Sequence, residues 1–251
     1  MVLVMIICPK CKKPAVRIQR YFVRRGDRVY KYLRVVHYEN GRIRFCHLPK
    51  EMLTSVIYGA RKGVAEAFKD VLLWYVPPPA RVLDITCGYK IMYRELLKHN
   101  YGYQFVFMDV RGEVKPDVVA DLRKAPFRDN VRFDAIVFDP PYPVHPSSRD
   151  SRVKEYGYGL SKHKLHEYYV ELVKAVNNYA NMVKYFLIVK TMDYELNGKL
   201  YPAIYEVTRM LTNFELYDIV IYRFFKRSYL RSLSGRVPRK HTYFLIYRPR
   251  I

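Results

Sequence analysis

Long apolar runs and acidic chain ends are both missing from this 251-residue sequence. No apolar run reaches the about 18 residues that a membrane-spanning helix needs. The opening MVLVMII is shorter than a secretory signal and lacks its basic start and small-residue cleavage site. We therefore expect a globular, cytoplasmic protein that does not span a membrane. Its length allows one substantial core and a small accessory module, and the sequence leaves the oligomeric state open.

Acidic residues are scarce at both ends of the chain. Residues 1–50 contain 13 Lys and Arg against 2 Asp and Glu, residues 219–251 contain 9 against none, and the formal net charge is +22. Lys and Arg neutralise phosphates and release counterions, so basic ends around a nearly neutral middle predict a nucleic-acid partner, either DNA or RNA. The alternative is the charge enrichment of thermophile proteins, which the presence of only two Gln favours.

Cysteine is also scarce, and four cysteines in a cytosolic chain are not expected to form a disulfide framework. Cys8 and Cys11 have the two-residue spacing that holds two corners of a tetrahedral zinc site. The strands predicted after them, rich in Tyr, Val and Arg, resemble a zinc ribbon. Cys87 lies elsewhere, in a glycine turn, where we expect it to fill space in the core.

The other two zinc ligands are predicted from a hairpin. Asn40-Gly41 is a two-residue turn signal that places Glu39 opposite Arg42, and therefore His37 opposite Arg44. Side chains alternate between the faces of a strand, so Cys46 shares a face with His37, while His47 points the other way. We therefore predict a structural zinc bound by Cys8, Cys11, His37 and Cys46. Two alternatives stay open: His47 as the fourth ligand, or a cysteine pair that binds no metal.

The chain changes character near residue 52. Residues 51–76 show a helical spacing of apolar side chains, and the VPPPA that follows cannot continue a helix. We predict a zinc ribbon-like nucleic-acid-binding module over residues 1–51 and a second domain over residues 52–251.

Strands and helices alternate from residue 81 onward. Strands are predicted over 81–88, 103–110, 117–122, 133–142 and 185–191, with helices over 91–100 and 165–183. Continuous apolar strands of this kind predict an α/β fold with a parallel sheet covered on both faces. Ligands of such sheets bind beyond the carboxyl ends of the strands.

An acid marks the end of each of the first four strands: Asp84 and Asp109 lie at the ends of the first two, and Asp121 and Asp139 come after the third and fourth. Their carboxylates should meet at one edge of the sheet, where they would suit a polar, partly cationic ligand. An acid at the end of the second strand is well placed to bind ribose hydroxyls. Alternatively, Asp109 and Asp121 are helix caps or turn residues.

VLDITCGYKIMYRELL, FVFMDVR, KPDVVADLRKAPF and FDAIVFDPPYP together resemble the class I S-adenosylmethionine-dependent methyltransferases. The last run resembles the DPPY motif of the branch that methylates exocyclic amines of nucleic-acid bases, small prophage-type and archaeal methylases in particular. The resemblance covers residues 81–192, with a fainter echo at 239–249. It implies a Rossmann-like, mostly parallel sheet with an antiparallel closing hairpin. One departure is Lys90, which stands where the family usually has a second glycine. The implied cofactor-binding residues are Asp84, Thr86, Gly88, Asp109, Asp121, Leu122 and Asp139.

The same resemblance assigns catalysis to Asp139, Pro140, Pro141 and Tyr142. Asp139 would accept one hydrogen of the target amine and the Pro140 carbonyl the other, while the prolines stiffen the loop. Tyr142 would stack on the extruded base. An acid at the first motif position favours adenine N6 in DNA. An RNA base methyltransferase, a protein-glutamine methyltransferase and a non-catalytic nucleic-acid-binding protein of the same fold are the alternatives.

Two basic segments could contact the substrate. Residues 144–164 are predicted to form a lid over the base, or else a disordered insertion. Residues 226–241 are basic and aromatic and predict a second nucleic-acid contact. His145, His163 and His166 receive no catalytic role, because amine methylation needs no imidazole. The predicted substrate-binding residues are Tyr142, Arg149, Arg152, Lys154 and Lys190, with Tyr156 and Tyr158 available for stacking.

Overall fold

The structure is a computed structural model. It describes residues 6–8, 10–48, 56–58, 63–128, 130–142, 162–196, 198–223 and 241–250. Most of the predicted lid lies outside the described residues, including Arg149, Arg152, Lys154, Tyr156 and Tyr158. Residues 226–240 of the predicted nucleic-acid contact and the predicted domain boundary near residue 52 also lie outside them.

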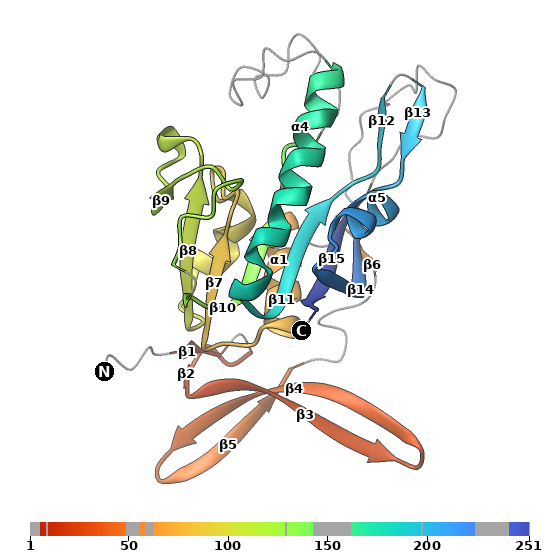
Figure 1. The fold of residues 1–251 in the computed structure, drawn as a ribbon. Helices are drawn as coiled ribbons and strands as arrows, with labels where there is room; N and C mark the ends of the chain where they lie inside the picture. The colour runs from red at the N-terminus through yellow and green to blue at the C-terminus, as the bar shows by residue number, and fades with distance from the viewer. Residues whose placement is uncertain are drawn as a thin grey trace.

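A mixed sheet forms the centre of the molecule (Figure 1). Among the described residues its strand order is β6-β14-β15-β11-β10-β7-β8-β9. The strands β7 to β11 are parallel to one another, whereas β15 runs antiparallel to both β11 and β14. This arrangement confirms the Rossmann-like, mostly parallel sheet with an antiparallel closing hairpin. The strands are β6 (Val56–Tyr58), β7 (Ala80–Asp84), β8 (Tyr103–Asp109), β9 (Val118–Val119), β10 (Phe133–Phe138), β11 (Val183–Thr191), β14 (Phe214–Arg223) and β15 (His241–Pro249).

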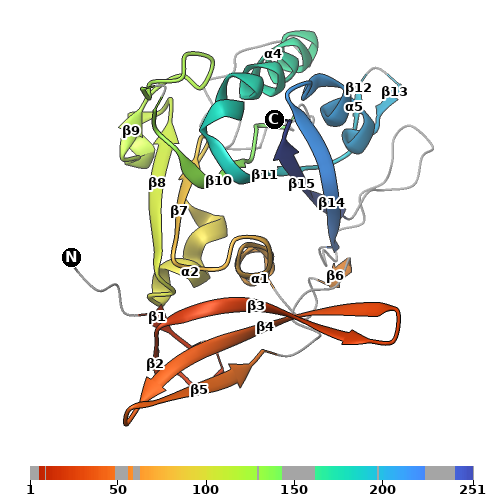
Figure 2. The ribbon, with the colours of Figure 1, turned by 60° about the horizontal axis from the view of Figure 1, so that its bottom comes forward.

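Helices cover both faces of this sheet (Figures 1 and 2). Two adjacent residues of β7 show why: Val82 packs into one hydrophobic cluster with Phe68 of α1, and Leu83 packs into another with Tyr169 of α4. A parallel strand buried on both sides reads as a continuous apolar run, as the sequence does here. The helical elements are α1 (Val64–Tyr75), η2 (Ile91–Tyr93), α2 (Arg94–Lys98), η3 (Gly112–Val114), α4 (Lys162–Ala175), η4 (Val176–Met182) and α5 (Ala203–Met210), and a short hairpin is formed by β12 (Tyr194–Leu196) and β13 (Lys199–Tyr201).

The helix predicted over residues 51–76 is wrong at its start. Residues 56–58 form β6, which pairs in parallel with residues 221–223 of β14 at the edge of the sheet, and the helix begins only after Gly63. Val, Ile and Tyr fit a pleated edge strand better than a helix. Because tertiary pairing decides between the two, the apolar spacing alone gave the wrong answer there.

The N-terminal part of the chain forms a three-stranded antiparallel sheet of β3 (Arg17–Arg25), β4 (Arg28–Glu39) and β5 (Arg42–His47), preceded by the pair β1 (Ile6–Ile7) and β2 (Pro14–Ala15). Glu39 pairs with Arg42 and His37 pairs with Arg44, which confirms the predicted hairpin register. Asn40 and Gly41 have φ values of 50° and 75°, as a type I′ turn requires.

This N-terminal sheet packs beneath α1, at the end of the central sheet where β7 begins (Figure 2). Ile18, Leu33 and Val35 belong to the hydrophobic cluster that contains α1. The Arg20 guanidinium donates a hydrogen bond to the carbonyl oxygen of Tyr75, the last residue of α1. The N-terminal sheet therefore extends the core at the amino ends of the parallel strands.

Candidate active site and candidate metal centre

The carboxyl ends of the parallel strands surround a cavity of about 460 Å³. All four acids that follow the strands line it, although they are separated by up to 55 positions in the sequence. The parallel topology brings them together, because every carboxyl end meets the same edge. The cavity is also lined by the other described residues predicted for the cofactor, for catalysis and for the substrate: Thr86, Gly88, Leu122, Pro140, Pro141, Tyr142 and Lys190.

The turn after β7 forms one wall of the cavity. The Thr86 N–H donates to Asp84 Oδ1 at 2.8 Å, and the Gly88 N–H donates to Asp109 Oδ2 at 2.8 Å. Gly88 has a φ of +49°, a left-handed conformation that side chains disfavour. Lys90, at the position of the family's second glycine, is left-handed as well, with a φ of 56°. Lys90 therefore adopts the backbone conformation that a glycine would adopt at this position.

The acids at the next two strand ends close their own turns. Asp109 Oδ1 accepts hydrogen bonds from the backbone N–H of Arg111 at 3.0 Å and from its Nε at 3.2 Å. Asp121 repeats this arrangement with Arg123, whose side chain also holds the pKa of the Asp121 carboxyl below its ordinary value. Asp109 and Asp121 are therefore turn residues, the alternative that the sequence left open, and they also line the cavity.

Asp84 is the most buried of the four acids. Its residue is 2% exposed, and burial raises the pKa of its carboxyl to about 7, with the neighbouring Asp139 and Asp109 charges adding to the shift. Tyr93 lies beside it at the end of η2, and its buried hydroxyl interacts with the Asp84 carboxyl, which offsets part of this rise in pKa. The buried Asp84 and Tyr93 therefore place polar groups on the cavity wall, where a polar ligand group can bind them.

The loop after β10 carries the DPPY sequence and forms the opposite wall. Lys190 Nζ, at the end of β11, donates to both carboxylate oxygens of Asp139 at 2.9 and 2.8 Å and to the Tyr142 hydroxyl at 2.9 Å. The Tyr142 hydroxyl donates to Asp139 Oδ1 at 2.6 Å. Thr86 joins the two walls, because its hydroxyl accepts the backbone N–H of Asp139 at 2.9 Å. A charged, hydrogen-bonded triad therefore stands where the target amine is predicted to bind.

Sequence reasoning missed part of this lining. Tyr93 lies in the run that resembles the methyltransferases, but nothing in the sequence assigned it a role. Leu165, Tyr168 and Leu172 of α4 also line the cavity, and their spacing of three and four residues marks one face of the helix. Cys87 behaves as predicted, since it is buried in the core cluster and burial raises the pKa of its thiol to about 12.

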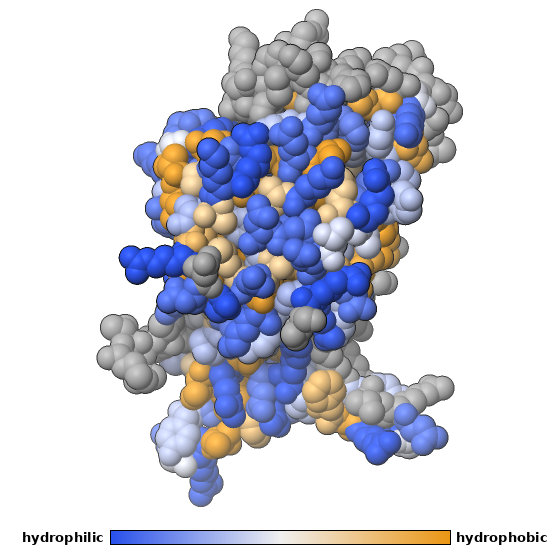
Figure 3. All heavy atoms as spheres, in the orientation of Figure 1, coloured by the Kyte–Doolittle hydropathy of each residue, from blue (hydrophilic) through white to orange (hydrophobic). Residues whose placement is uncertain are grey.

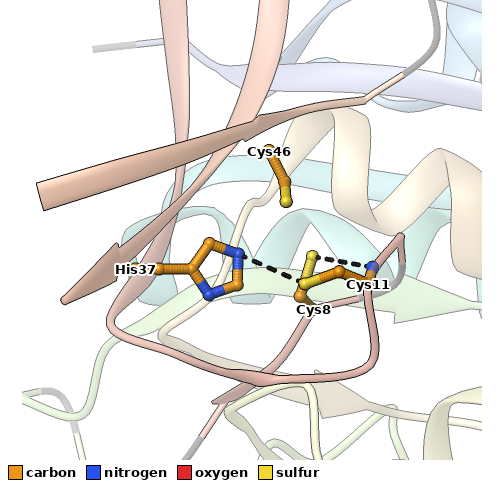
Figure 4. Close-up of side chains that lie close together, drawn as sticks. All are labelled: Cys8, Cys11, His37 and Cys46. Carbon is orange, nitrogen blue, oxygen red and sulfur yellow. Dashed lines mark hydrogen bonds between the residues drawn. The ribbon is translucent and has the colours of Figure 1, made fainter. Parts of the chain in front are cut away.

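A second cluster of reactive side chains lies on the face of the N-terminal sheet that carries His37 and Cys46. One ligand atom from each of Cys8, Cys11, His37 and Cys46 lies within 4.8 Å of the other three, and the four side chains converge on one point (Figure 4). Zinc–sulfur bonds of about 2.3 Å in a tetrahedron place ligand atoms slightly less than 4 Å apart, so the cluster has nearly the required size. The structure brings together the four residues predicted from spacing and strand register.

The two candidate histidines lie on opposite faces of the sheet. His37 is 2% exposed, and its Nδ1 lies 2.8 Å from the Pro14 carbonyl oxygen, so Nε2 is directed at Cys11 Sγ, 3.6 Å away. A hydrogen bond of this kind on the other ring nitrogen is usual for a metal-binding histidine. His47 instead pairs its Nδ1 with the Tyr21 hydroxyl at 2.8 Å, away from the cysteines.

The comparisons with known proteins give only distant likenesses. No family model matches the chain, and no curated protein matches it. Similar solved structures include the glycopeptide N-methyltransferase MtfA complexed with sinefungin, at 13% identity and TM-score 0.42, covering 75% of this chain and 94% of that one. Another is the 1,6-didemethyltoxoflavin-N1-methyltransferase of Burkholderia thailandensis, at 12% identity and TM-score 0.43, covering 93% and 100%. A third is the 16S rRNA (adenine(1408)-N(1))-methyltransferase of Catenulisporales acidiphilia, at 13% and 0.38, covering 68% and 88%. Values this low support no conclusion about activity.

No helix in the described part of the chain is long and apolar enough to cross a membrane.

Proposed function

We propose that this protein is an S-adenosylmethionine-dependent methyltransferase that acts on the exocyclic amine of a nucleic-acid base, adenine N6 in DNA. One observation carries the proposal: a single cavity unites the acids after β7 and β8 with the Asp139–Tyr142 loop, and the bond between Asp139 and Thr86 ties the two walls together. A methyl transfer needs its donor and acceptor held in one geometry, and such positioning can lower a barrier by about 7 to 11 kcal/mol.

The residues on the β7 and β8 side fit the cofactor. Tyr93 offers a buried hydroxyl, Asp84 and Asp109 offer carboxylates, and Gly88 leaves the backbone accessible. These groups, with Thr86, Asp121 and Leu122, would hold S-adenosylmethionine, which supplies a methyl group on a sulfonium. The acids would suit the positive charge of the donor.

The residues of the opposite wall would prepare the acceptor. The lone pair of an exocyclic amine is delocalised into its ring, so the amine needs acceptors that hold its two hydrogens and free the lone pair. Asp139 and the Pro140 carbonyl are the proposed acceptors. Lys190 donates to both oxygens of Asp139 and Tyr142 donates to Oδ1, so Oδ2 keeps an acceptor position that the incoming amine can use. Lys190 then continues to orient the carboxylate through the other oxygen.

In this proposal the cysteine cluster binds a structural zinc. Three thiolates and one imidazole form a closed ligand set, which is typical of structural rather than catalytic zinc. The metal would join the loop at Cys8–Cys11 to the hairpin of β4 and β5, and so stabilise the N-terminal sheet.

The central test compares two asparagine variants of the same strand region. Asp139→Asn should reduce methyl transfer at least a thousandfold, because it removes the carboxylate that accepts the amine hydrogen, while cofactor affinity stays within about tenfold. Asp134→Asn is the matched control: Asp134 lies at the other end of β10, where it accepts the Arg81 N–H at 2.8 Å, and its activity should be close to that of the wild type.

The readout is mass spectrometry of nucleosides from DNA and RNA incubated with protein and labelled cofactor. N6-methyladenine in DNA is the expected product. Full activity in Asp139→Asn would contradict the assigned role, and a methylated base found only in RNA would replace DNA by RNA as the substrate. Calorimetry tests the non-catalytic alternative, because a folded protein that does not bind S-adenosylmethionine is not this enzyme.

A further inference from the structure

The two faces of the N-terminal sheet are built from different residues. Ile18, Leu33 and Val35 point inward, where they join the hydrophobic cluster around α1. Strand alternation therefore turns their neighbours outward, and the cross-strand register aligns these neighbours on one surface, which we call the outer face. The described side chains of the outer face are Arg17, Gln19, Tyr21, Val23, Arg25, Tyr30, Tyr32, Arg34, Val36, Tyr38, Ile43, Phe45 and His47.

Flat side chains run across the outer face. The rings of Tyr21 and Tyr32 stack with centroids 5.3 Å apart, and His47 packs against Tyr21 at 5.5 Å. The Arg34 guanidinium lies 4.0 Å from the centre of the Phe45 ring and 5.0 Å from that of Tyr21. Arg34 therefore joins these rings into one continuous aromatic and cationic surface.

Much of this surface is open to solvent. Tyr38 is 66% exposed, Ile43 61% and Phe45 44%. Figure 3 shows strongly hydrophilic and hydrophobic residues side by side on the N-terminal sheet, rather than the uniformly polar surface of a solvated sheet. A contiguous exposed patch of this kind marks an interaction site.

The charge of the outer face has one sign. Arg17, Arg25 and Arg34 belong to it, and no Asp or Glu is among its described members. The acids of the N-terminal sheet lie elsewhere. Asp27 is in the turn between β3 and β4, and Glu39 lies on the inner side. The Glu39 carboxylate is 3.4 Å from Lys13 Nζ and 3.9 Å from Arg44 Nε. A polyanion is the partner that this charge distribution complements.

We propose that the outer face binds a single-stranded stretch of DNA by stacking its bases on Tyr38, Phe45 and the neighbouring rings, with the arginines on the phosphates. Unpaired bases offer exposed π faces for stacking, whereas the bases of a duplex already cover one another. The proposal rests on the proposed function for the choice of DNA. Because the outer face lies at the amino ends of the parallel strands and the cavity at their carboxyl ends, it would hold DNA at a distance from the target base.

Fluorescence anisotropy with labelled oligothymidylate tests this directly. An oligonucleotide without adenine is not a substrate of the proposed active site, so its binding reports on other surfaces. The double variant Tyr38→Ala/Phe45→Ala should bind at least about fivefold more weakly, since stacking on one aromatic ring is worth that much or more. Arg34→Gln should make the slope of log affinity against log salt shallower by roughly 0.7, as expected for one phosphate contact on a single strand.

Phe22→Ala is the matched control. Phe22 lies in β3 of the same sheet, on the inner face. Its side chain is 65% exposed, so the rest of the protein does not cover it there. The control should bind oligothymidylate like the wild type, and thermal melting should show that all variants are folded.

Three results would overturn the proposal: wild-type affinity in the double variant, equal weakening by Phe22→Ala, or a preference for duplex DNA over oligothymidylate. Tighter binding of oligouridylate would overturn the choice of DNA. Calorimetry with S-adenosylmethionine on the same variants keeps this test separate from the proposed function. Loss of oligothymidylate binding with intact cofactor binding supports the outer face, and absence of cofactor binding in every variant contradicts only the enzyme.

Discussion

The cavity at the carboxyl edge and the cysteine cluster of the N-terminal sheet gather reactive side chains by different means. The cluster takes its residues from one knuckle and one hairpin within 39 positions of the chain, so strand register alone puts His37 and Cys46 on one face of the sheet. The cavity takes its acids from four separate strand ends, and only the parallel topology makes them neighbours. Local geometry thus selected the members of the first site, whereas long-range pairing assembled the second.

The comparison also separates what each region needs to stay folded. The cavity is surrounded by two large hydrophobic clusters, but the N-terminal sheet buries only its inner face, near α1. A small sheet with one covered face has little core of its own, so a metal is a natural addition to it. Three predictions follow this contrast, from the largest effect to the smallest.

Removal of the ligands should affect the N-terminal sheet far more than the cavity. We expect purified protein to contain one zinc per chain, and His37→Ala to lose it and melt roughly 10 °C or more below the wild type. His47→Ala is the control, since His47 contacts Tyr21 on the other face and should keep the metal. Metal analysis by mass spectrometry together with thermal melting provides the measurement.

Loss of the metal in His47→Ala together with its retention in His37→Ala would assign the fourth ligand to His47. Protein that contains no metal, purified without chelator, would contradict the zinc site. Binding of S-adenosylmethionine by His37→Ala below its melting temperature should stay within a few fold of the wild type, because the cavity lies at the far end of the strands.

Loss of the lysine that holds Asp139 should slow the reaction without weakening cofactor binding. Lys190→Met removes the donor to both carboxylate oxygens, so Asp139 is less well oriented toward the amine. We expect kcat to fall about tenfold or more, with the KM for S-adenosylmethionine nearly unchanged. Lys184→Met, at the start of the same strand and paired with Asp134 at 3.4 Å, should leave both constants unchanged. A rise in kcat for Lys190→Met would show that the lysine blocks the amine instead of orienting its acceptor.

The smallest effect concerns stability against pH. The pKa of Asp84 is about 7 in the folded protein, above its ordinary value of 3.8, because the carboxyl is fully buried. Between these two values the folded state holds more protons than the unfolded state, so the contribution of Asp84 to stability declines as pH rises from about 4 to about 7. Asp84→Asn, which cannot ionise, should therefore melt a few degrees above the ligand-free wild type at pH 8 and much closer to it at pH 5.

Calorimetric melting at the two pH values is the measurement. If the wild type were more stable than Asp84→Asn at pH 8, the hydrogen bonds to the Asp84 carboxylate would offset the free-energy cost of burying its charge, even without a ligand. A gap between the two proteins that widens toward pH 5 would contradict the raised pKa.

Several features could be predicted because they depend on short stretches of chain. The Asn40-Gly41 turn requires a particular backbone twist, and that twist determined the register of β4 and β5. The apolar runs of β7 and β10 can only be buried on both sides, which indicated a parallel sheet with helices on each face. The failure at residues 56–58 has the same origin, because an isolated apolar stretch does not reveal whether a strand edge is free to receive it.

The sequence by itself determined the alternation of strands and helices over residues 80–191, indicated the four residues of the candidate metal centre and identified the acids of the cavity, since periodicity, turn chemistry and strand ends are local properties. Only the tertiary structure decided that Lys190 and Tyr142 hold Asp139, that the buried Tyr93 hydroxyl lies beside Asp84, and that the N-terminal sheet lies at the end opposite the cavity. These contacts join segments far apart in the chain, and their geometry depends on how the whole core packs.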